Sequence, residues 1–424
     1  MSRVKVCLIA AVFLLVGGKE GYAESNLQQE IDRALEGSTI ILQDKIYEGP
    51  IKISKSIHLI GKKGTVIQYS GKGPAITIKG EDVQLEDVSV NVKGLTKSQP
   101  AIFLSGRGHS ISQVNIKTDG IGIKLDYADS IKVEKTTITG NGEDNAIDLW
   151  ESNDNQFKNN QLKIVQDGFY AENSHGNQFV HNEIEKAHYG LHLMYSDSSV
   201  IENNVSQNNF TGAMIMGAEA TVIRNNVFAD NRENVNSQGL LLYETSDAKI
   251  SDNQIVNNRI GIFIEEANEN QLKQNLIKGN FVGIQFKNAS KNQLKNNDFF
   301  GNVNESQAIN SHQNTFTHNY WDEGTHLDRN QDGISDIAYQ ADPYFLALTE
   351  EVPEYRLFFQ APGMVILQKL LKSPDTKLLI DKEPSMVTNS VQKKAIDHNM
   401  IVWLTCSLLL LLSLSLFIKG RKSL

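Results

Sequence analysis

The chain has 424 residues and a formal net charge of −9, from 41 Lys and Arg against 50 Asp and Glu. An acidic balance with its cations scattered along the chain argues against a nucleic-acid-binding protein. Both cysteines, Cys7 and Cys406, lie in hydrophobic segments near the termini. The chain between them can therefore form neither a disulfide nor a thiolate metal site.

Residues 1–23 have the pattern of a secretory signal peptide. Arg3 and Lys5 precede an apolar stretch at 6–18, and the small residues Gly21 and Ala23 follow. This arrangement predicts export, with cleavage after Ala23. We assign residues 24–74 to an N-terminal cap and the first coils of the next domain, with a short amphipathic helix at 26–35 covering the open end.

Two series of residues recur along the middle of the chain with the same rhythm. Each has steps of 22 residues and a single step of 27. One series is the structural ladder Asn160, Asn182, Asn204, Asn226, Asn253, Asn275, Asn297 and Asn319. The other consists of Ala146, Gly168, Gly190, Gly212, Gly239, Gly261 and Gly283, each of which opens a short run of alternating apolar residues. Because the two series share one insertion, they belong to one repeating unit.

The repeat predicts an all-β solenoid. A period of 20 to 50 residues indicates stacked units, and alternation with period two indicates strands that bury one face. A coil of this length holds three short strands and stacks on the next coil at about 4.8 Å. We therefore predict a right-handed parallel β-helix of 22-residue coils over residues 75–320. The asparagines suit its turns because Asn tolerates a left-handed backbone, and stacked amides can donate to each other.

Four soft donor side chains are expected to cluster on the outer face of this solenoid. If Leu191 and Leu193 face inward, then His192 and Met194 face outward, and Met214 and Met216 occupy the same positions one coil later. Imidazole and thioether ligands without thiolate suit copper(I). The four residues are the copper candidate. The alternative is that this apolar and sulfur-rich stripe contacts another protein.

An acidic turn is predicted at residues 321–345. It contains the calcium candidate Asp328, Asn330, Asp332 and Asp336, with oxygen donors at alternate positions around a glycine. A complete EF-hand is excluded because the twelfth position is a tyrosine. The alternatives are a looser calcium-binding turn and a plain turn stabilised by Asx side chains.

A glycosidase active site on the outer face of the solenoid would need two carboxylates about 5 to 9.5 Å apart. Asp148 and Glu172 could meet that distance, but acids are frequent enough here for one such pair to arise by chance. The sequence carries none of the G-H-G, R-I-K or D-P-H-D motifs of polysaccharide hydrolases and epimerases of this shape. We therefore expect a protein that is not an enzyme.

The C-terminal part has a different composition. Residues 346–398 form the expected docking segment, with the apolar residues Leu357, Phe358, Phe359 and Met364 as candidates for partner contact. The alternative is that its apolar pieces pack on the final coil as a cap. Residues 399–418 are predicted to be a transmembrane helix, because 400–418 contains no charge and is long enough to cross a bilayer. Three basic residues within 419–424 place this tail in the cytoplasm. The expected location is the outer face of the cytoplasmic membrane.

Several motifs in a fixed order give the chain a resemblance to one family. They are the G-P-I-K-I-S-K-S-I-H-L-I-G run at 49–61, the repeats with their asparagines, N-Y-W-D at 319–322, D-G-I-S-D at 332–336, and Asp381, Pro384 and Met386. Together they resemble the NosD family, the maturation factors of nitrous oxide reductase. A terminal membrane span departs from the usual periplasmic description of that family.

The resemblance implies an exported, non-enzymatic β-helix. Its partners would be the permease and ATPase of an ABC transporter, a copper-carrying lipoprotein and nitrous oxide reductase, acting together in copper centre assembly. The apolar docking segment would then rest on the permease. Copper(I) and calcium are the two candidate cofactors. The alternative function is a membrane-anchored β-helix that binds or cleaves polysaccharide.

Overall fold

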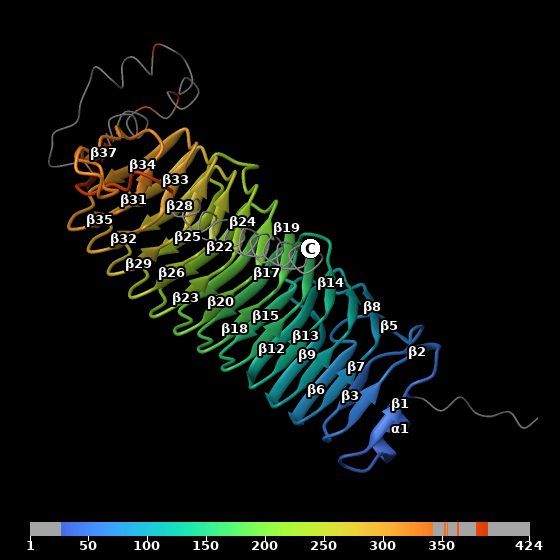
Figure 1. Cartoon of the computed structure of the whole chain (residues 1–424). Coiled ribbons are helices and arrows are strands. Elements are labelled where there is room, and N and C mark those ends of the chain that lie inside the picture. The colour runs from blue at the N-terminus through green and yellow to red at the C-terminus, as the bar shows by residue number, and fades with distance from the viewer. Residues whose placement is uncertain (1–26, 342–351, 353, 355–362, 364–378, 389–424) are drawn as a thin grey trace, which may run out of the picture.

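The computed structural model describes residues 27–341, 352, 354, 363 and 379–388. The described chain is a right-handed parallel β-helix of about 13 turns, which confirms the predicted fold class. Its coils stack into an elongated solenoid (Figure 1). The short helix α1 (Leu27–Arg33) lies at the N-terminal end and buries Leu27 and Ile31. The sequence predicted this helix over 26–35.

The strands form two long sheets. One sheet contains β1 (Thr39–Ile41), β4 (His58–Ile60), β7 (Gln84–Glu86), β10 (Ser110–Ser112), β13 (Lys132–Glu134), β16 (Gln156–Lys158), β18 (Gln178–Val180), β20 (Val200–Glu202), β23 (Val222–Arg224), β26 (Lys249–Ser251), β29 (Gln271–Lys273), β32 (Gln293–Lys295), β35 (Thr315–Thr317), β38 (Leu379–Asp381) and β37 (Tyr339–Ala341). Parallel pairing begins at β1, so the first coils lie before residue 75.

The second sheet wraps the remaining two sides of each coil. It contains β2 (Ile46–Glu48), β3 (Ile51–Ile53), β5 (Val66–Ser70), β6 (Ile76–Glu81), β8 (Ser89–Lys93), β9 (Pro100–Arg107), β11 (Asn115–Lys117), β12 (Ile121–Asp129), β14 (Thr137–Thr139), β15 (Ile147–Trp150), β17 (Gln161–Glu172), β19 (Glu183–Met194), β21 (Val205–Gln207), β22 (Thr211–Met216), β24 (Val227–Ala229), β25 (Gln238–Tyr243), β27 (Gln254–Val256), β28 (Ile260–Glu265), β30 (Leu276–Lys278), β31 (Val282–Lys287), β33 (Asp298–Phe300), β34 (Asn304–Ile309) and β36 (Tyr320–Trp321).

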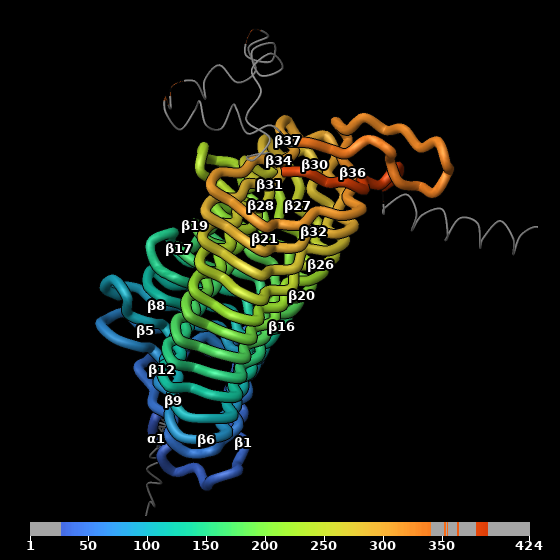
Figure 2. The backbone as a smooth tube through the Cα atoms, turned by 90° about the vertical axis from the view of Figure 1, so that its left-hand side faces the viewer, coloured from blue at the N-terminus to red at the C-terminus, as the bar shows by residue number. Residues whose placement is uncertain are grey.

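The register of the stack makes the core a set of continuous columns. Phe157 of β16 lies opposite Phe179 of β18, and their rings stack at 5.3 Å between centroids. The edge of Phe169 meets both rings, at 5.4 and 4.9 Å. Figure 2 shows the coils superposed from α1 at one end to β37 at the other. Since each coil buries its inward face against its neighbours, the core is as long as the solenoid itself.

The asparagines of the predicted ladder are all buried and joined by hydrogen bonds. In the repeating pattern, the side chain of Asn182 donates from Nδ2 to Asn204 Oδ1 at 3.0 Å, and its backbone N–H donates to the same oxygen at 2.8 Å. Its Nδ2 also donates to the carbonyl of Phe157. The left-handed residue in each turn is the preceding one, such as Asn203 with φ of 56°. The ladder asparagine therefore acts through its amide rather than through an unusual backbone.

A second buried asparagine ladder runs along another corner of the coils. It consists of Asn209, Asn231, Asn258, Asn280 and Asn302, and each of the first four donates its backbone N–H to the amide oxygen of the next. These residues have the same spacing as the first ladder, so the sequence contained the signal although the first series alone was assigned. A shorter ladder of Asn270, Asn292 and Asn314 lies at the third corner, so side-chain amides stabilise all three corners of the coil.

An aspartate ends the first ladder at the C-terminal end of the solenoid. Asp381 Oδ2 accepts hydrogen bonds from the backbone N–H and Nδ2 of Asn319, at 3.1 and 3.0 Å, and from Trp321 Nε1 at 3.1 Å. Trp321 is stacked between Phe299 and Tyr339. The chain therefore returns after residue 378 to close the stack with a carboxylate in the position of the next amide.

Three predictions fall on segments outside the described residues. These are the signal peptide at 1–23, the partner contacts at Leu357, Phe358, Phe359 and Met364, and the transmembrane helix at 399–418. In residues 27–341 and 379–388, no helix has the length and apolar character needed to cross a membrane.

Candidate functional site

Strands β17 and β19 differ from the other strands of the solenoid. Each is 12 residues long and continues through a corner at which the neighbouring coils break into two strands. Left-handed residues at Ile164 and Lys186 make this bend. Aromatic, acidic and sulfur-containing side chains occur together in the outward columns here, at Tyr170, Glu172, His192, Met194, Met214 and Met216. This region is the candidate functional site.

The strand register brings the four copper candidates together. His192 lies opposite Met214, and Met194 lies opposite Met216, on the adjacent strands β19 and β22. Leu191 and Leu193 are fully buried between them, so the alternation places all four candidates on the outer face. Met214 is nevertheless only 9% exposed. The four side chains therefore form a compact patch of one imidazole and three thioethers.

The imidazole of His192 is held in one orientation by a carboxylate. His192 Nδ1 lies 2.9 Å from Asp167 Oδ2, and both side chains are largely buried. Because a carboxylate accepts, the bond is read with the proton on Nδ1, which leaves Nε2 with its lone pair. In the described part of the chain, His192 Nε2 is buried without a hydrogen-bond partner. A buried nitrogen of this kind is a ready ligand for a metal.

Tyrosine residues surround the imidazole and reach the methionines. The rings of Tyr170 and Tyr189 lie 5.2 and 4.7 Å from the His192 ring between centroids. The hydroxyl of Tyr170 donates to Glu172 Oε2 at 2.6 Å and lies 3.6 Å from Met194 Sδ. Burial and the hydrogen bond to Glu172 raise the pKa of Tyr170, so it stays protonated.

The acids of the patch give it a negative potential. Burial raises the pKa of Asp148 to about 6, and the nearby carboxylates of Asp167 and Glu172 add to this effect, while Lys124 opposes it. Asp148 lies opposite Tyr170 in the register, and Glu172 lies opposite Met194. The patch thus combines a cation-attracting field with soft ligands.

Two members of this cluster were missed by the sequence reasoning. Asp167 precedes Gly168, outside the alternating run that defined the outward columns, and the bend in β17 brings it to His192. His188 stacks on Phe210 at 4.6 Å and meets Tyr189 at 4.3 Å. Asp167 Oδ1 and His188 Nδ1 are also buried without a hydrogen-bond partner among the described residues. The alternation of inward and outward residues continues through 161–172, and this pattern could have revealed the long strand that carries Asp167.

The donor set fits copper(I) by its chemistry. Thioethers and a neutral imidazole are soft or borderline ligands, and a carboxylate behind the imidazole strengthens its basicity. No three His, Cys, Asp or Glu side chains in the described ranges converge as a metal site. The patch at His192 differs from such a group because three of its four members are methionines.

The calcium candidate residues form a tight loop whose oxygens accept internal hydrogen bonds. Asp328 accepts from the backbone N–H groups of Gln331, Asp332 and Gly333. Asp332 Oδ1 accepts from the N–H of Ile334, and Asn330 Nδ2 donates to Asp332 Oδ2. Asp336 is paired with Arg329, which holds the pKa of its carboxyl below the usual range. These bonds are those of a turn stabilised by Asx side chains, and calcium binding stays a prediction.

Solved structures similar to this chain share its fold at low sequence identity. The A-module of the mannuronan C-5 epimerase AlgE4 from Azotobacter vinelandii is 16% identical, with a TM-score of 0.58, covering 68% of this chain and 94% of its own. The A-module of AlgE6 from the same organism is 12% identical, with a TM-score of 0.57, covering 69% and 92%. The periplasmic alginate epimerase AlgG is 15% identical, with a TM-score of 0.54, covering 69% and 83%. No curated protein matches the chain.

Fold and sequence together define the class of the protein as a right-handed β-helix, and the model of the right-handed β-helix region matches residues 56–206. A second family model, described as periplasmic copper-binding protein (NosD), matches residues 134–344. The β-helix over residues 134–344 is therefore of the NosD type. The matched residues include every coil of the first asparagine ladder and the patch around His192.

Proposed function

We propose that this protein is an accessory factor for nitrous oxide reductase maturation and that it binds copper(I) at His192, Met194, Met214 and Met216. It acts with an ABC transporter in copper centre assembly. The observation that carries the copper site is the buried, unpartnered Nε2 of His192, next to three methionines on adjacent strands. The description of the family as periplasmic copper-binding supports the same metal.

Each residue has a distinct part in this proposal. His192 supplies one nitrogen ligand through Nε2, and Asp167 fixes the ring by accepting from Nδ1. The methionines supply sulfur ligands that favour copper(I) over zinc or calcium. Tyr170 and Tyr189 cover the imidazole and exclude water from one side. Neutral thioethers bind without releasing protons, so copper can be passed on without a change in their charge.

The partners follow from the family and stay proposals for this chain. They are the permease and ATPase of an ABC transporter, a copper-carrying lipoprotein and nitrous oxide reductase. We propose that the docking segment at 346–398 contacts the permease, and that the span at 399–418 tethers the protein to the membrane. Pull-down of the permease by the full chain, but not by a chain lacking 346–378, tests the first contact, because this deletion keeps β38 and Asp381; equal recovery would contradict it.

Anaerobic titration of the detergent-purified full chain with copper(I), against a competing chelator, tests the metal site. We expect one copper per chain and a loss of affinity of about 100-fold in a Met194→Leu, Met214→Leu double variant, which keeps apolar volume but removes two sulfurs. The matched control is Met386→Leu, a thioether outside the patch. The site would be refuted if the wild type bound no copper(I), or if the Met194→Leu, Met214→Leu variant bound copper(I) as tightly as the Met386→Leu control.

A further inference from the structure

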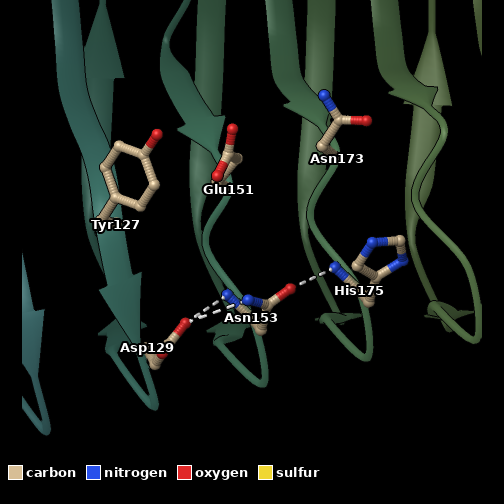
Figure 3. A pocket seen from close by; sticks show the side chains of 6 residues that line it. All are labelled: Tyr127, Asp129, Glu151, Asn153, Asn173 and His175. Atoms are coloured by element: carbon tan, nitrogen blue, oxygen red, sulfur yellow. Dashed lines mark hydrogen bonds between the residues drawn. The ribbon is translucent and has the colours of Figure 1, made fainter.

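A recess lies at the C-terminal ends of β12, β15 and β17, on the coils that precede those carrying the methionine patch. It has a volume of about 500 Å³ and is lined by Tyr127, Asp129, Glu151, Asn153, Asn173 and His175. Figure 3 shows these side chains in two rows that run along successive coils. One row is Tyr127, Glu151 and Asn173, and the other is Asp129, Asn153 and His175. The copper proposal uses none of them.

The row of Asp129, Asn153 and His175 is fixed by hydrogen bonds along the stack. Asp129 Oδ1 accepts from the N–H of Asn153 at 2.8 Å, and Asn153 Oδ1 accepts from the N–H of His175 at 2.8 Å. His175 Nδ1 in turn accepts from the N–H of Asp197 at 3.1 Å. The wall of the recess is therefore rigid before any ligand arrives.

The other row, in which Tyr127 is exposed and Glu151 and Asn173 are half-buried, has unused hydrogen-bonding groups. The side chains of Tyr127, Glu151 and Asn173 make no hydrogen bond within the described residues, and all three residues have a left-handed backbone that turns them outward. The next member of the row is Tyr195. Tyr127 is 62% exposed and Tyr195 is 47% exposed, so an aromatic ring stands at each end of a carboxylate and an amide.

The ring of Tyr195 is supported by the coil beyond it. Gly217 follows Tyr195 in the same row, and a Cβ atom at Gly217 would lie 2.6 Å from the Tyr195 ring. Glycine thus makes room for the ring to lie against the backbone. An exposed tyrosine held in this way presents a flat apolar face and a polar hydroxyl.

From this arrangement we infer that the row from Tyr127 to Tyr195 binds an uncharged oligosaccharide lying along the solenoid axis. Sugar rings have an apolar C–H face that stacks on tyrosine, and hydroxyls that bond to carboxylate and amide groups. Successive coils are about 4.8 Å apart, which is close to the length of one pyranose residue in an extended chain. The lining includes two carboxylates and no lysine or arginine, which disfavours acidic glycans.

Calorimetric titration of the full chain with cellohexaose and with chitohexaose tests this inference. We expect saturable binding of at least one of them, weakened about tenfold or more by Tyr127→Ala and by Tyr195→Ala. Tyr195→Phe keeps the ring and should retain binding. Tyr243→Ala is the control, since this tyrosine lies in the neighbouring outward column. Asn173→Ala offers a further variant if a tyrosine variant fails to fold.

Three results would overturn the inference. They are no binding of either uncharged hexasaccharide, tighter binding of an oligogalacturonate of the same length, and equal weakening by Tyr243→Ala. The copper(I) affinity of the tyrosine variants should match that of the wild type, because their side chains lie outside the methionine patch. Failure of the oligosaccharide inference is thus distinguishable from failure of the copper proposal.

Discussion

Buried polar groups are fully hydrogen-bonded at the corner of the asparagine ladder, whereas several of those around His192 are not. In the ladder, the amide of Asn204 uses its oxygen for two donors and its nitrogen for two acceptors. Around His192, three buried polar atoms have no partner among the described residues. Satisfied polar groups stabilise a fold, whereas unsatisfied ones mark a place where a ligand can contribute the missing contact. The other five unpartnered buried atoms of the described residues lie elsewhere in the solenoid, and the three around His192 differ from them by lying next to three methionines.

Removing one amide from the ladder should have the largest effect. Asn204→Ala leaves the backbone N–H of Asn182 without an acceptor, and it removes one of the two hydrogen bonds made by Asn182 Nδ2 and one of the two accepted by Asn226 Oδ1. We expect a loss of about 4 kcal/mol in the free energy of unfolding, measured by denaturant titration. Gln178→Ala, an exposed amide on an adjacent coil, is the control and should change stability little. A small effect of Asn204→Ala would remove the contrast between the two regions.

The scaffold contains one buried acid whose charge the fold disfavours. Burial raises the pKa of Glu305 to about 8 from a usual value of 4.5, and the carboxylates of Glu323 and Asp322 add to this. The folded state therefore keeps a proton that the unfolded state releases, so stability is highest at low pH and falls as pH rises from about 4.5 to 8. Between pH 6 and pH 9 we expect a loss of about 3 kcal/mol.

Thermal unfolding across this pH range measures the effect. Glu305→Gln should flatten the pH dependence, because the amide is neutral throughout. The exposed Glu233→Gln is the control and should leave the curve unchanged. Asp148, whose raised pKa is about 6, also titrates at the lower end of this range, but its contribution is the same in the wild type and in Glu305→Gln. An unchanged curve in Glu305→Gln would show that this acid is not the source of the pH dependence.

The aspartate that closes the ladder should matter less, since the last coil has fewer neighbours. Asp381→Ala leaves the backbone N–H of Asn319 and Trp321 Nε1 without an acceptor. We expect a loss of about 2 kcal/mol and faster hydrogen exchange at residues 315–321. Asp381→Asn keeps an oxygen that can accept from Asn319 and should retain most of the protection. Equal exchange in both variants would mean that the carboxylate does not close the stack.

The spacing of residues along the chain predicted the contacts between equivalent positions of successive coils. It predicted little of the backbone conformation and the contacts within a single coil. The steps of 22 residues located the first ladder and placed His192 beside Met214, because parallel register turns a fixed interval into spatial contact. The left-handed turn residue was assigned to the ladder asparagine, but it is the residue before it, such as Asn203. Asp381 was recognised only as part of a motif. Its contact with Asn319 spans 62 residues, which no period encodes.

The methionine patch is the part of the site that periodicity could reveal, and Asp167 is the part that it could not. Asp167 reaches His192 because β17 continues through a corner, so the pairing depends on a local bend rather than on the repeat. The carboxylate lies behind the imidazole, on the opposite nitrogen from the proposed ligand atom. This position makes Asp167 a positioning residue for His192 rather than a copper ligand.

Replacing the carboxylate of Asp167 should have the smallest effect of these substitutions, and it directly tests whether the region around His192 differs from the asparagine ladder. Asp167→Asn keeps the shape of the side chain but weakens its hold on the Nδ1 proton, so copper(I) affinity should fall about tenfold. Glu172→Gln changes an acid that contacts Tyr170 instead of the imidazole, and it controls for the loss of one negative charge. Nuclear magnetic resonance of the imidazole nitrogens should show the proton less confined to Nδ1 in Asp167→Asn alone. If both variants weaken copper binding equally while the tautomer is unchanged, the carboxylate acts only through its charge, and the unpartnered Nε2 is not oriented by it.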